Sequence, residues 1–211
     1  MCRLFNENKT ENNLIVIEGI IGSGKTTLGK ILKFNIDNCI FIEEQVDNDL
    51  LKQFIQDMKR YVYPFQLSML IRRHEAYLKA LWYCNNGYKV ILDRSLIGDQ
   101  AFIQTQYQMG NLEKCDYEML LNLLQKYTSN LPKPKTVIYL DTNIDTAMKR
   151  IQNRNRSGED KYQREYQCYL RDNYIEVLRN YSDIIKFYDW NEDYGNVNSI
   201  PIHELISKHF Q

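Results

Sequence analysis

The glycine-rich turn between Gly19 and Thr26 has the residue types and spacing to bind a phosphate chain. Its pattern is G-x-x-x-x-G-K-T, and it lies between an apolar run, LIVI at 14–17, and a helix-like segment. Glycines let successive backbone N–H groups point inward around a phosphate, and the helix that begins near Gly24 adds its positive dipole end. Lys25 would reach the β- and γ-phosphates, and the Thr26 hydroxyl would hold Mg²⁺. The predicted ATP-binding residues of this P-loop are Gly19, Gly22, Ser23, Gly24, Lys25, Thr26 and Thr27.

Acidic residues follow two further strand-like runs. CIFI at 39–42 ends in Glu43-Glu44, and YKVIL at 88–92 ends in Asp93-Arg94-Ser95. Because the carboxyl ends of parallel strands face one crevice, we expect these carboxylates beside the phosphates. Asp93 would then lie near Mg²⁺, and Arg94 would neutralise the oxygens of a transferring phosphate.

A helix-like segment carries two polar residues beside an apolar stripe. Gln66 and Arg73 are two turns apart and therefore lie on one face, close to Met69 and Leu70. They are either surface residues or the polar groups of a pocket for a flat ring. Asp99 stands at the start of a later helix, where an acidic residue is also favourable for the helix dipole alone.

Three arginines, Arg150, Arg154 and Arg156, form a basic cluster that is followed by Ser157-Gly158-Glu159. Most basic clusters are solvated surface. In a chain with a P-loop and zero net charge, closely spaced arginines beside a glycine hinge favour a mobile lid that closes over phosphates.

Short apolar runs alternate with helix-like segments along the whole chain, which predicts one α/β domain with a parallel sheet. The strands are expected at 14–17, 39–42, 88–92, 136–140 and 184–188. Helices are expected from Gly24 and at 49–61, 64–86, 96–107, 113–127, 144–150, 163–181 and 202–210, with a break near Pro64. The predicted domain covers residues 14–211, after a flexible polar tail at 1–13.

The composition limits the classes of partner. Lys plus Arg and Asp plus Glu each number 27, so the formal net charge is zero and does not favour binding of nucleic acid or of an acidic membrane surface. No apolar run approaches the length of a membrane span. The five cysteines are scattered without C-x-x-C, which is typical of free thiols in a reducing compartment, and we expect a cytoplasmic protein.

Taken together and in this order, the motifs resemble the deoxynucleoside kinases, most closely the deoxycytidine, deoxyguanosine and bacterial deoxyadenosine kinase group. The likeness extends from Leu14 to Tyr194. The matching pieces are EGIIGSGKTTL at 18–28, Glu44-Gln45-Val46, Phe65-Gln66, Asp93-Arg94-Ser95, Arg150 to Glu159 and Asn191 to Tyr194.

This resemblance implies a P-loop kinase with a five-stranded parallel sheet, flanking helices and an arginine-rich lid. It implies that Glu44 is the general base for a nucleoside 5′-hydroxyl and that Arg94 holds both that hydroxyl and the base. Mg²⁺ and ATP would be the cofactors, with Thr26 and Asp93 serving the metal and Arg150, Arg154 and Arg156 forming the lid. Glu159 would reach the sugar, and Asp193-Tyr194 would flank the base of ATP. A homodimer, formed through the helices after Asp93 and near Gln163, is a further expectation from the family.

The likeness also assigns a base pocket to Gln66, Arg73 and Asp99. Asp99 would fix the Arg73 guanidinium and accept a hydrogen bond from an exocyclic amine, while Arg73 donates to a ring nitrogen or carbonyl oxygen. Thymine lacks the amine and adds a methyl group. We therefore expect deoxyadenosine, deoxycytidine or deoxyguanosine to be preferred over thymidine, without a ranking among the three.

Two departures from the family pattern bear on the site. Gln45 replaces the usual proline after Glu44, which leaves Glu43 as a rival base. Ile55 stands where the family has a tyrosine that contacts the sugar 3′-hydroxyl.

Two other functions compete with this interpretation. A thymidylate-type nucleoside monophosphate kinase shares the P-loop, the Asp-Arg pair and the lid, but it typically shows D-R-Y-x-x-S-x-x-A-Y-Q where this chain has DRSLIGDQAF at 93–102. A P-loop switch or silent nucleotide-binding module is the other alternative, although the chain has no guanine-reading N-K-x-D.

Overall fold

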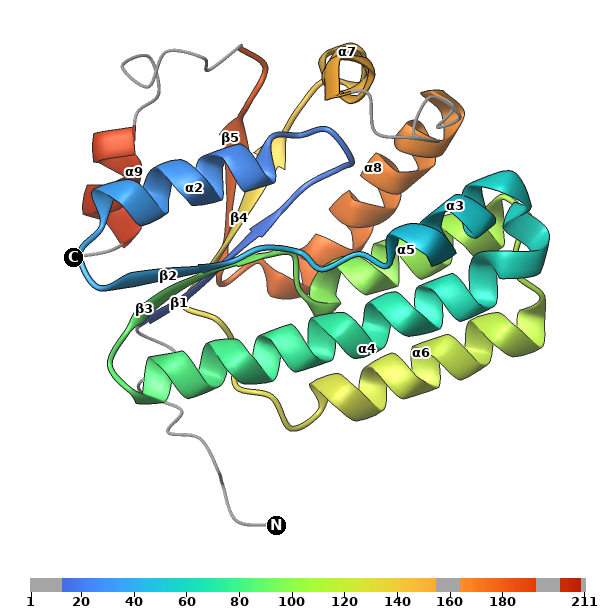
Figure 1. Cartoon of the computed structure of the whole chain (residues 1–211), viewed down its shortest axis with the longest axis horizontal. Helices are drawn as coiled ribbons and strands as arrows, with labels where there is room; N and C mark the ends of the chain where they lie inside the picture. Colours follow the sequence, from blue (N-terminus) through green and yellow to red (C-terminus); the bar gives the residue numbers. More distant parts are fainter. Residues whose placement is uncertain (1–12, 155–163, 193–201, 210–211) are drawn as a thin grey trace.

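Five parallel strands form one sheet in the computed structural model, which describes residues 13–154, 164–192 and 202–209 (of 202–204 only the backbone) (Figure 1). The strand order is β2-β3-β1-β4-β5. The strands are β1 Leu14–Glu18, β2 Cys39–Ile42, β3 Lys89–Asp93, β4 Thr136–Asp141 and β5 Ile185–Asp189. Each lies within about a residue of its predicted position, and the predicted α/β class with a five-stranded parallel sheet is confirmed.

Both faces of the sheet are covered by helices, and the alternation of side chains along β1 explains why. Ile15 and Ile17 pack on one face against α2 and α9, whereas Leu14 and Val16 belong to the larger core on the opposite face. All five residues of β1 are buried. A strand covered on both faces must be apolar throughout, which is why the sequence shows an unbroken apolar run there.

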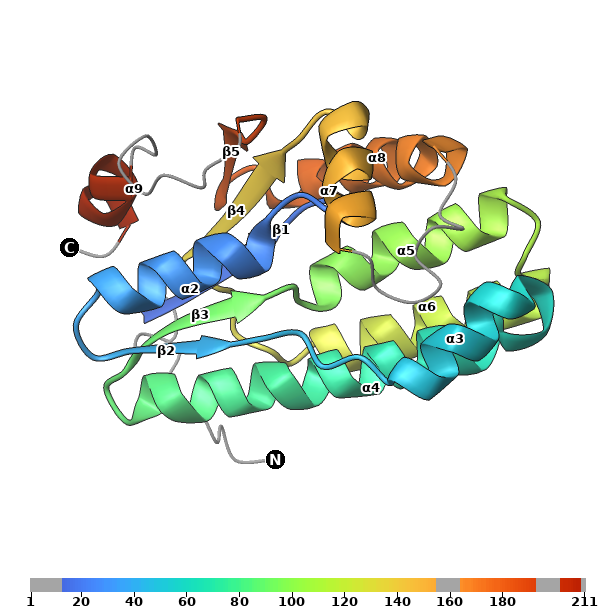
Figure 2. The same ribbon diagram turned by 45° about the horizontal axis from the view of Figure 1, so that its top comes forward.

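One or two α-helices follow each strand along the chain (Figures 1 and 2). They are α2 Lys25–Asn35, α3 Asn48–Gln56, α4 Met58–Asn85, α5 Leu96–Gln108, α6 Lys114–Thr128, α7 Ile144–Arg154, α8 Arg164–Leu178 and α9 Ile202–His209, with a short 3₁₀ helix at Arg179–Tyr181. In this part of the chain no helix is long and apolar enough to cross a membrane.

The predicted helix break near Pro64 is wrong, because the chain breaks at Asp57 and Pro64 lies inside α4. Asp57 ends α3 with its backbone N–H and begins α4 by accepting a hydrogen bond from the Arg60 N–H at 3.2 Å. Pro64 costs α4 one backbone hydrogen bond, but it lies on the exposed side, where water can satisfy the freed carbonyl.

The strand register brings the predicted site segments to one edge of the sheet. Ile17 of β1 is opposite Asp93 of β3, and Ile42 of β2 is opposite Leu92. The chain therefore leaves β1, β2 and β3 at the same level, through the P-loop, Glu43-Glu44 and Asp93-Arg94 respectively. This is the carboxyl edge at which open α/β sheets bind ligands.

Candidate active site

The P-loop follows β1 as a tight turn that depends on glycine. Gly22 and Gly24 have φ of 80° and 93°, in the left-handed region that side chains disfavour. A Cβ at Gly22 would lie 2.5 Å from the Ala147 carbonyl oxygen, so α7 packs directly on the turn. Lys25 folds inward, with Nζ donating to Ile20 O at 2.8 Å and to Ser23 Oγ at 3.1 Å. Burial lowers the Lys25 pKa to about 7, which a phosphate chain would reverse.

The two predicted metal-site residues lie in contact. Thr26 Oγ1 donates to Asp93 Oδ2 at 2.6 Å, and Asp93 Oδ1 is buried with no partner among the described residues. Burial raises the Asp93 pKa. An uncompensated carboxylate oxygen beside a hydroxyl and the P-loop fits the hard oxygen ligands of Mg²⁺.

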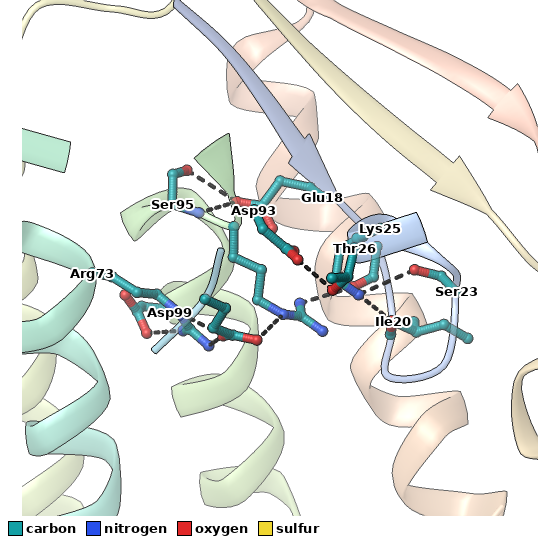
Figure 3. A network of polar contacts seen from close by, with 12 residues as sticks. Glu18, Ile20, Ser23, Lys25, Thr26, Arg73, Asp93, Ser95 and Asp99 are labelled. Atoms are coloured by element: carbon teal, nitrogen blue, oxygen red, sulfur yellow. Dashed lines mark hydrogen bonds and ion pairs between the residues drawn. The ribbon is translucent and has the colours of Figure 1, made fainter. Parts of the chain in front are cut away.

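Glu44 lies between two guanidinium groups, one of which belongs to Arg73, which is labelled in Figure 3. Its Oε1 accepts from Arg73 Nε at 3.1 Å and Nη2 at 2.5 Å, and its Oε2 accepts from Arg94 Nε at 3.2 Å. Burial alone would raise the Glu44 pKa, but Arg73 and Arg94 outweigh it and lower the pKa to about 2. Its neighbour Glu43 is exposed and instead faces Lys30, with Oε1 3.3 Å from Nζ.

Arg73 also holds Asp99, so one guanidinium joins two carboxylates. Arg73 Nη1 donates to Asp99 Oδ1, and both side chains are almost fully buried. Asp99 Oδ2 is buried without a partner in the described part of the chain. Burial raises the Asp99 pKa to about 7 despite the neighbouring Arg73.

Apolar and aromatic side chains wall a cavity of about 320 Å³, which is also lined by Lys25, Thr26, Glu44, Arg73, Asp93 and Arg94. Asp99 is fully buried and is not part of this lining, whereas its partner Arg73 is. Gln66, buried at 2% exposure, is part of its lining. Phe65 stacks on Phe54 with ring centroids 4.7 Å apart, and Phe102 lies under the guanidinium groups of Arg73 and Arg94 at 5.2 and 4.8 Å. The further lining residues include Met69, Val46, Leu51 and Tyr166.

The position that departs from the family tyrosine does not line this cavity. Ile55 is packed in the core of α3, whereas the preceding residue, Phe54, forms part of the wall. An aromatic ring thus takes the α3 side of the pocket, and it carries no hydroxyl.

The lid arginines are only partly described. Arg154, at the end of α7, lines the cavity. Arg150 points to the other side of the P-loop, where it donates to Ser23 O at 3.3 Å, Trp190 O at 3.0 Å and Glu192 O at 2.6 Å. Thr27 is exposed on the first turn of α2. The predicted residues Arg156, Glu159, Asp193 and Tyr194 lie outside the described ranges.

Three residues of this constellation escaped the sequence analysis. Glu18 ends β1 and is fully buried among polar partners, so the strand-end argument applied to Asp93 could have found it. Phe102 follows Asp99 by three positions and therefore lies on the same helix face, which was a usable signal. Tyr174 of α8 reaches Arg94 across 80 positions, and no local pattern indicates that contact.

Comparisons with known proteins show what the chain as a whole is similar to. A model of the deoxynucleoside kinase family matches residues 15–206. The chain is 34% identical over 184 residues to a deoxyguanosine kinase of Lactobacillus johnsonii, covering 84% of this chain and 79% of that one. It is 30% identical over 185 residues to a deoxyadenosine kinase of Dictyostelium discoideum, covering 86% and 74%. Among solved structures, deoxyadenosine kinase from M. mycoides with bound dCTP has a TM-score of 0.79 at 28% identity, covering 92% of this chain and 99% of that one.

Proposed function

The chain belongs to the deoxynucleoside kinase family, and we propose that within this family it phosphorylates deoxyadenosine, deoxycytidine or deoxyguanosine in preference to thymidine. The enzyme is a phosphotransferase of the nucleoside kinase type and not of the thymidylate type. The preference among bases is the finer statement that the site geometry supports.

The observation that carries the proposal is the unpartnered Oδ2 of Asp99 at the end of the Arg73 pair. A buried carboxylate oxygen without a donor has a large cost unless a ligand supplies one. Adenine, cytosine and guanine each have an exocyclic amine that can donate to it, whereas thymine presents a carbonyl oxygen in the equivalent place. The flat base would lie against Phe102, beside Gln66.

Glu44 would accept the proton of the nucleoside 5′-hydroxyl. Its low pKa means that it is ionised at any working pH, so it is always available to orient that hydroxyl. Phosphoryl transfer has a loose transition state in which alignment and charge neutralisation matter more than the strength of the base. Arg94 and Arg154 line the same cavity and would stabilise the oxygens of the transferring phosphate, with Arg156 as a further lid residue.

ATP would bind with its phosphates in the P-loop and its β- and γ-oxygens at Lys25. Thr26 and Asp93 would hold Mg²⁺, which supplies charge neutralisation between the β- and γ-phosphates when bound. Asp93 Oδ1 has no other partner among the described residues, which supports this assignment.

We further propose a cytoplasmic homodimer. Helices α4 and α6 lie side by side (Figures 1 and 2). Large apolar side chains are exposed on both, since Ile71 and Trp82 of α4 are 39% and 57% exposed and Met119 of α6 is 56% exposed. Large exposed apolar side chains on two adjacent helices are enriched at protein interfaces, which supports this proposal. Sedimentation velocity on the wild type and on a Trp82→Lys, Met119→Lys variant tests this, since only the wild type should sediment as a dimer.

The acceptor of the phosphate is the test of the main proposal. Purified enzyme is incubated with ATP and Mg²⁺ and, separately, with deoxyadenosine, deoxycytidine, deoxyguanosine, thymidine or thymidine monophosphate, and the products are identified by mass. The proposal expects a 5′-monophosphate from at least one amine-bearing nucleoside. Formation of thymidine diphosphate alone, or ATP binding without any transfer, would contradict it.

A further inference from the structure

Glu18 is a fully buried carboxylate that takes no part in the roles assigned so far. It ends β1, directly before the P-loop. Its Oε1 accepts from the Ser95 backbone N–H at 2.8 Å and from Ser95 Oγ at 2.9 Å, and its Oε2 accepts from Tyr174 Oη at 3.0 Å. Burial raises the Glu18 pKa, and the three donors that converge on its carboxylate oppose this by favouring the ionised form.

The Tyr174 hydroxyl connects Glu18 to Arg94 through hydrogen bonds. Arg94 Nη1 lies 2.6 Å from Tyr174 Oη. A guanidinium has no acceptor atom, so Arg94 must donate, and the hydroxyl proton of Tyr174 must therefore point to Glu18. Burial raises the Tyr174 pKa well above its usual value, which keeps that proton in place.

Glu18 therefore fixes Arg94 at both ends. It binds the backbone of the next residue, Ser95, and through Tyr174 it binds the guanidinium tip. Arg94 itself has φ of 67°, a left-handed conformation that is unusual for a residue with a side chain and that persists only where its surroundings hold it.

The hydrogen bonds of Arg94 leave one nitrogen of its guanidinium group available to a ligand. Arg94 Nη1 donates to Gly19 O at 2.8 Å as well as to Tyr174, and Nε donates to Glu44. Nη2 has no partner among the described residues, while Arg94 is part of the cavity lining. We propose that Glu18 and Tyr174 are positioning residues, which hold Arg94 so that Nε orients Glu44 and Nη2 faces the reacting oxygens. This inference rests on the proposed role of Arg94 in phosphoryl transfer.

Gly98 is independent evidence that the hydrogen-bonded pair of Glu18 and Tyr174 occupies the space where a side chain at position 98 would lie. A Cβ at position 98 would lie 2.5 Å from Tyr174 Oη and 2.8 Å from Glu18 Oε2. Gly98 is in the first turn of α5 and has no left-handed backbone angle, so its conformation does not require glycine. The close approach of the hydrogen-bonded pair is what excludes a side chain there.

The test compares two tyrosines whose rings lie close together. Tyr174→Phe removes the bridging hydroxyl and keeps the ring. Tyr139→Phe is the matched control, because Tyr139 is equally buried, its ring centroid lies 5.6 Å from that of Tyr174, and it makes no hydrogen bond to Arg94. Steady-state kcat and KM for the best nucleoside and for ATP are measured for both variants, with Tm as the measure of folding.

We expect Tyr174→Phe to lower kcat by about 10- to 100-fold with both KM values nearly unchanged, because misplacing a reacting group acts on the transition state. Tyr139→Phe should keep wild-type kcat. A purely structural role would lower Tm and leave kcat of the folded enzyme intact. Equal kcat for the two variants would overturn the inference.

Gly98→Ala provides a second route to the same pair. The added methyl group should displace the Tyr174 hydroxyl, so kcat should fall, and the double variant with Tyr174→Phe should be no slower than the slower single variant. Independent, multiplying losses would contradict a shared mechanism. A wild type without any kinase activity would overturn the proposed function and this inference together, whereas an active wild type with an equally active Tyr174→Phe variant overturns only the inference.

Discussion

Arg73 binds Glu44 through two nitrogens, with Nε 3.1 Å and Nη2 2.5 Å from the same carboxylate oxygen. The third nitrogen of this guanidinium, Nη1, holds Asp99. A single side chain therefore connects the residue proposed to read the nucleobase with the residue proposed to receive the proton. A base that fails to satisfy Asp99 disturbs Arg73, and with it the orientation of Glu44. Discrimination between bases is thus expected to affect kcat as well as KM.

Replacing the proposed base should abolish most of the chemistry and little of the nucleotide binding. Glu44→Gln cannot accept the 5′-hydroxyl proton, so we expect kcat to fall by about 10²- to 10⁴-fold. Affinity for ATP, measured by calorimetry, should stay near that of the wild type. Glu43→Gln is the matched control, since Glu43 faces Lys30, and it should retain activity. A larger loss in the Glu43 variant would transfer the role to that residue.

Removing the Arg73–Asp99 pair should shift the preference toward thymidine. The double variant Arg73→Met, Asp99→Ala loses both the charge that reads the amine and the charge that balances it, so no buried ion is left unpaired between the two. We expect the ratio of kcat/KM for thymidine over deoxycytidine to rise by about tenfold or more. Thermal unfolding serves as the control for folding, and a ratio equal to that of the wild type speaks against this pair as the base reader.

The pH dependence should reflect Asp99 and not Glu44. Asp99 has a pKa raised to about 7, so it gains a proton as the pH falls through 7 and then no longer accepts well from an amine. Glu44, with a pKa of about 2, stays ionised over the same range. With saturating ATP, whose phosphates keep Lys25 protonated, we expect kcat/KM for amine-bearing nucleosides to rise with pH through about 7. Asp99→Asn should lower kcat/KM and remove most of this rise with pH. A rise that persists in the variant must come from the titration of another group.

The proposed metal site predicts a graded response at Thr26. Thr26→Ala removes the hydroxyl that donates to Asp93, and it should raise the Mg²⁺ concentration for half-maximal activity by about tenfold, the scale on which metal-site partners act. Thr26→Ser keeps a hydroxyl and should behave like the wild type. Titration of activity with Mg²⁺ at fixed ATP makes the comparison. An equal Mg²⁺ requirement in both variants would remove Thr26 from the site.

The strands and the acidic residues that follow them could be predicted from the sequence, because both depend on local patterns. Apolar runs set the five strands, and the residues that follow them, Glu44 and Asp93, had to meet at the carboxyl edge. The helix break was misplaced because Asp57 supplies the cap, whereas Pro64 is tolerated on the exposed side of a long packed helix.

The support behind the site could not be predicted in the same way. Tyr174 contacts Glu18 and Arg94 only because α8 packs against α5, and a tyrosine in a helix carries no mark of its partner. The pocket wall shows a similar limit, since helical phase determines that Phe54 and not Ile55 faces the cavity. A hydrophobic pattern does not tell which of two adjacent apolar residues of a helix faces a cavity.

The discrimination between bases by the wild-type enzyme tests the central claim most directly. We would measure kcat/KM for deoxyadenosine, deoxycytidine, deoxyguanosine and thymidine at pH 8 with saturating ATP and Mg²⁺. The unpartnered Asp99 oxygen predicts that at least one amine-bearing nucleoside exceeds thymidine by about 100-fold or more. Thymidine turned over as well as, or better than, the other three would contradict the account.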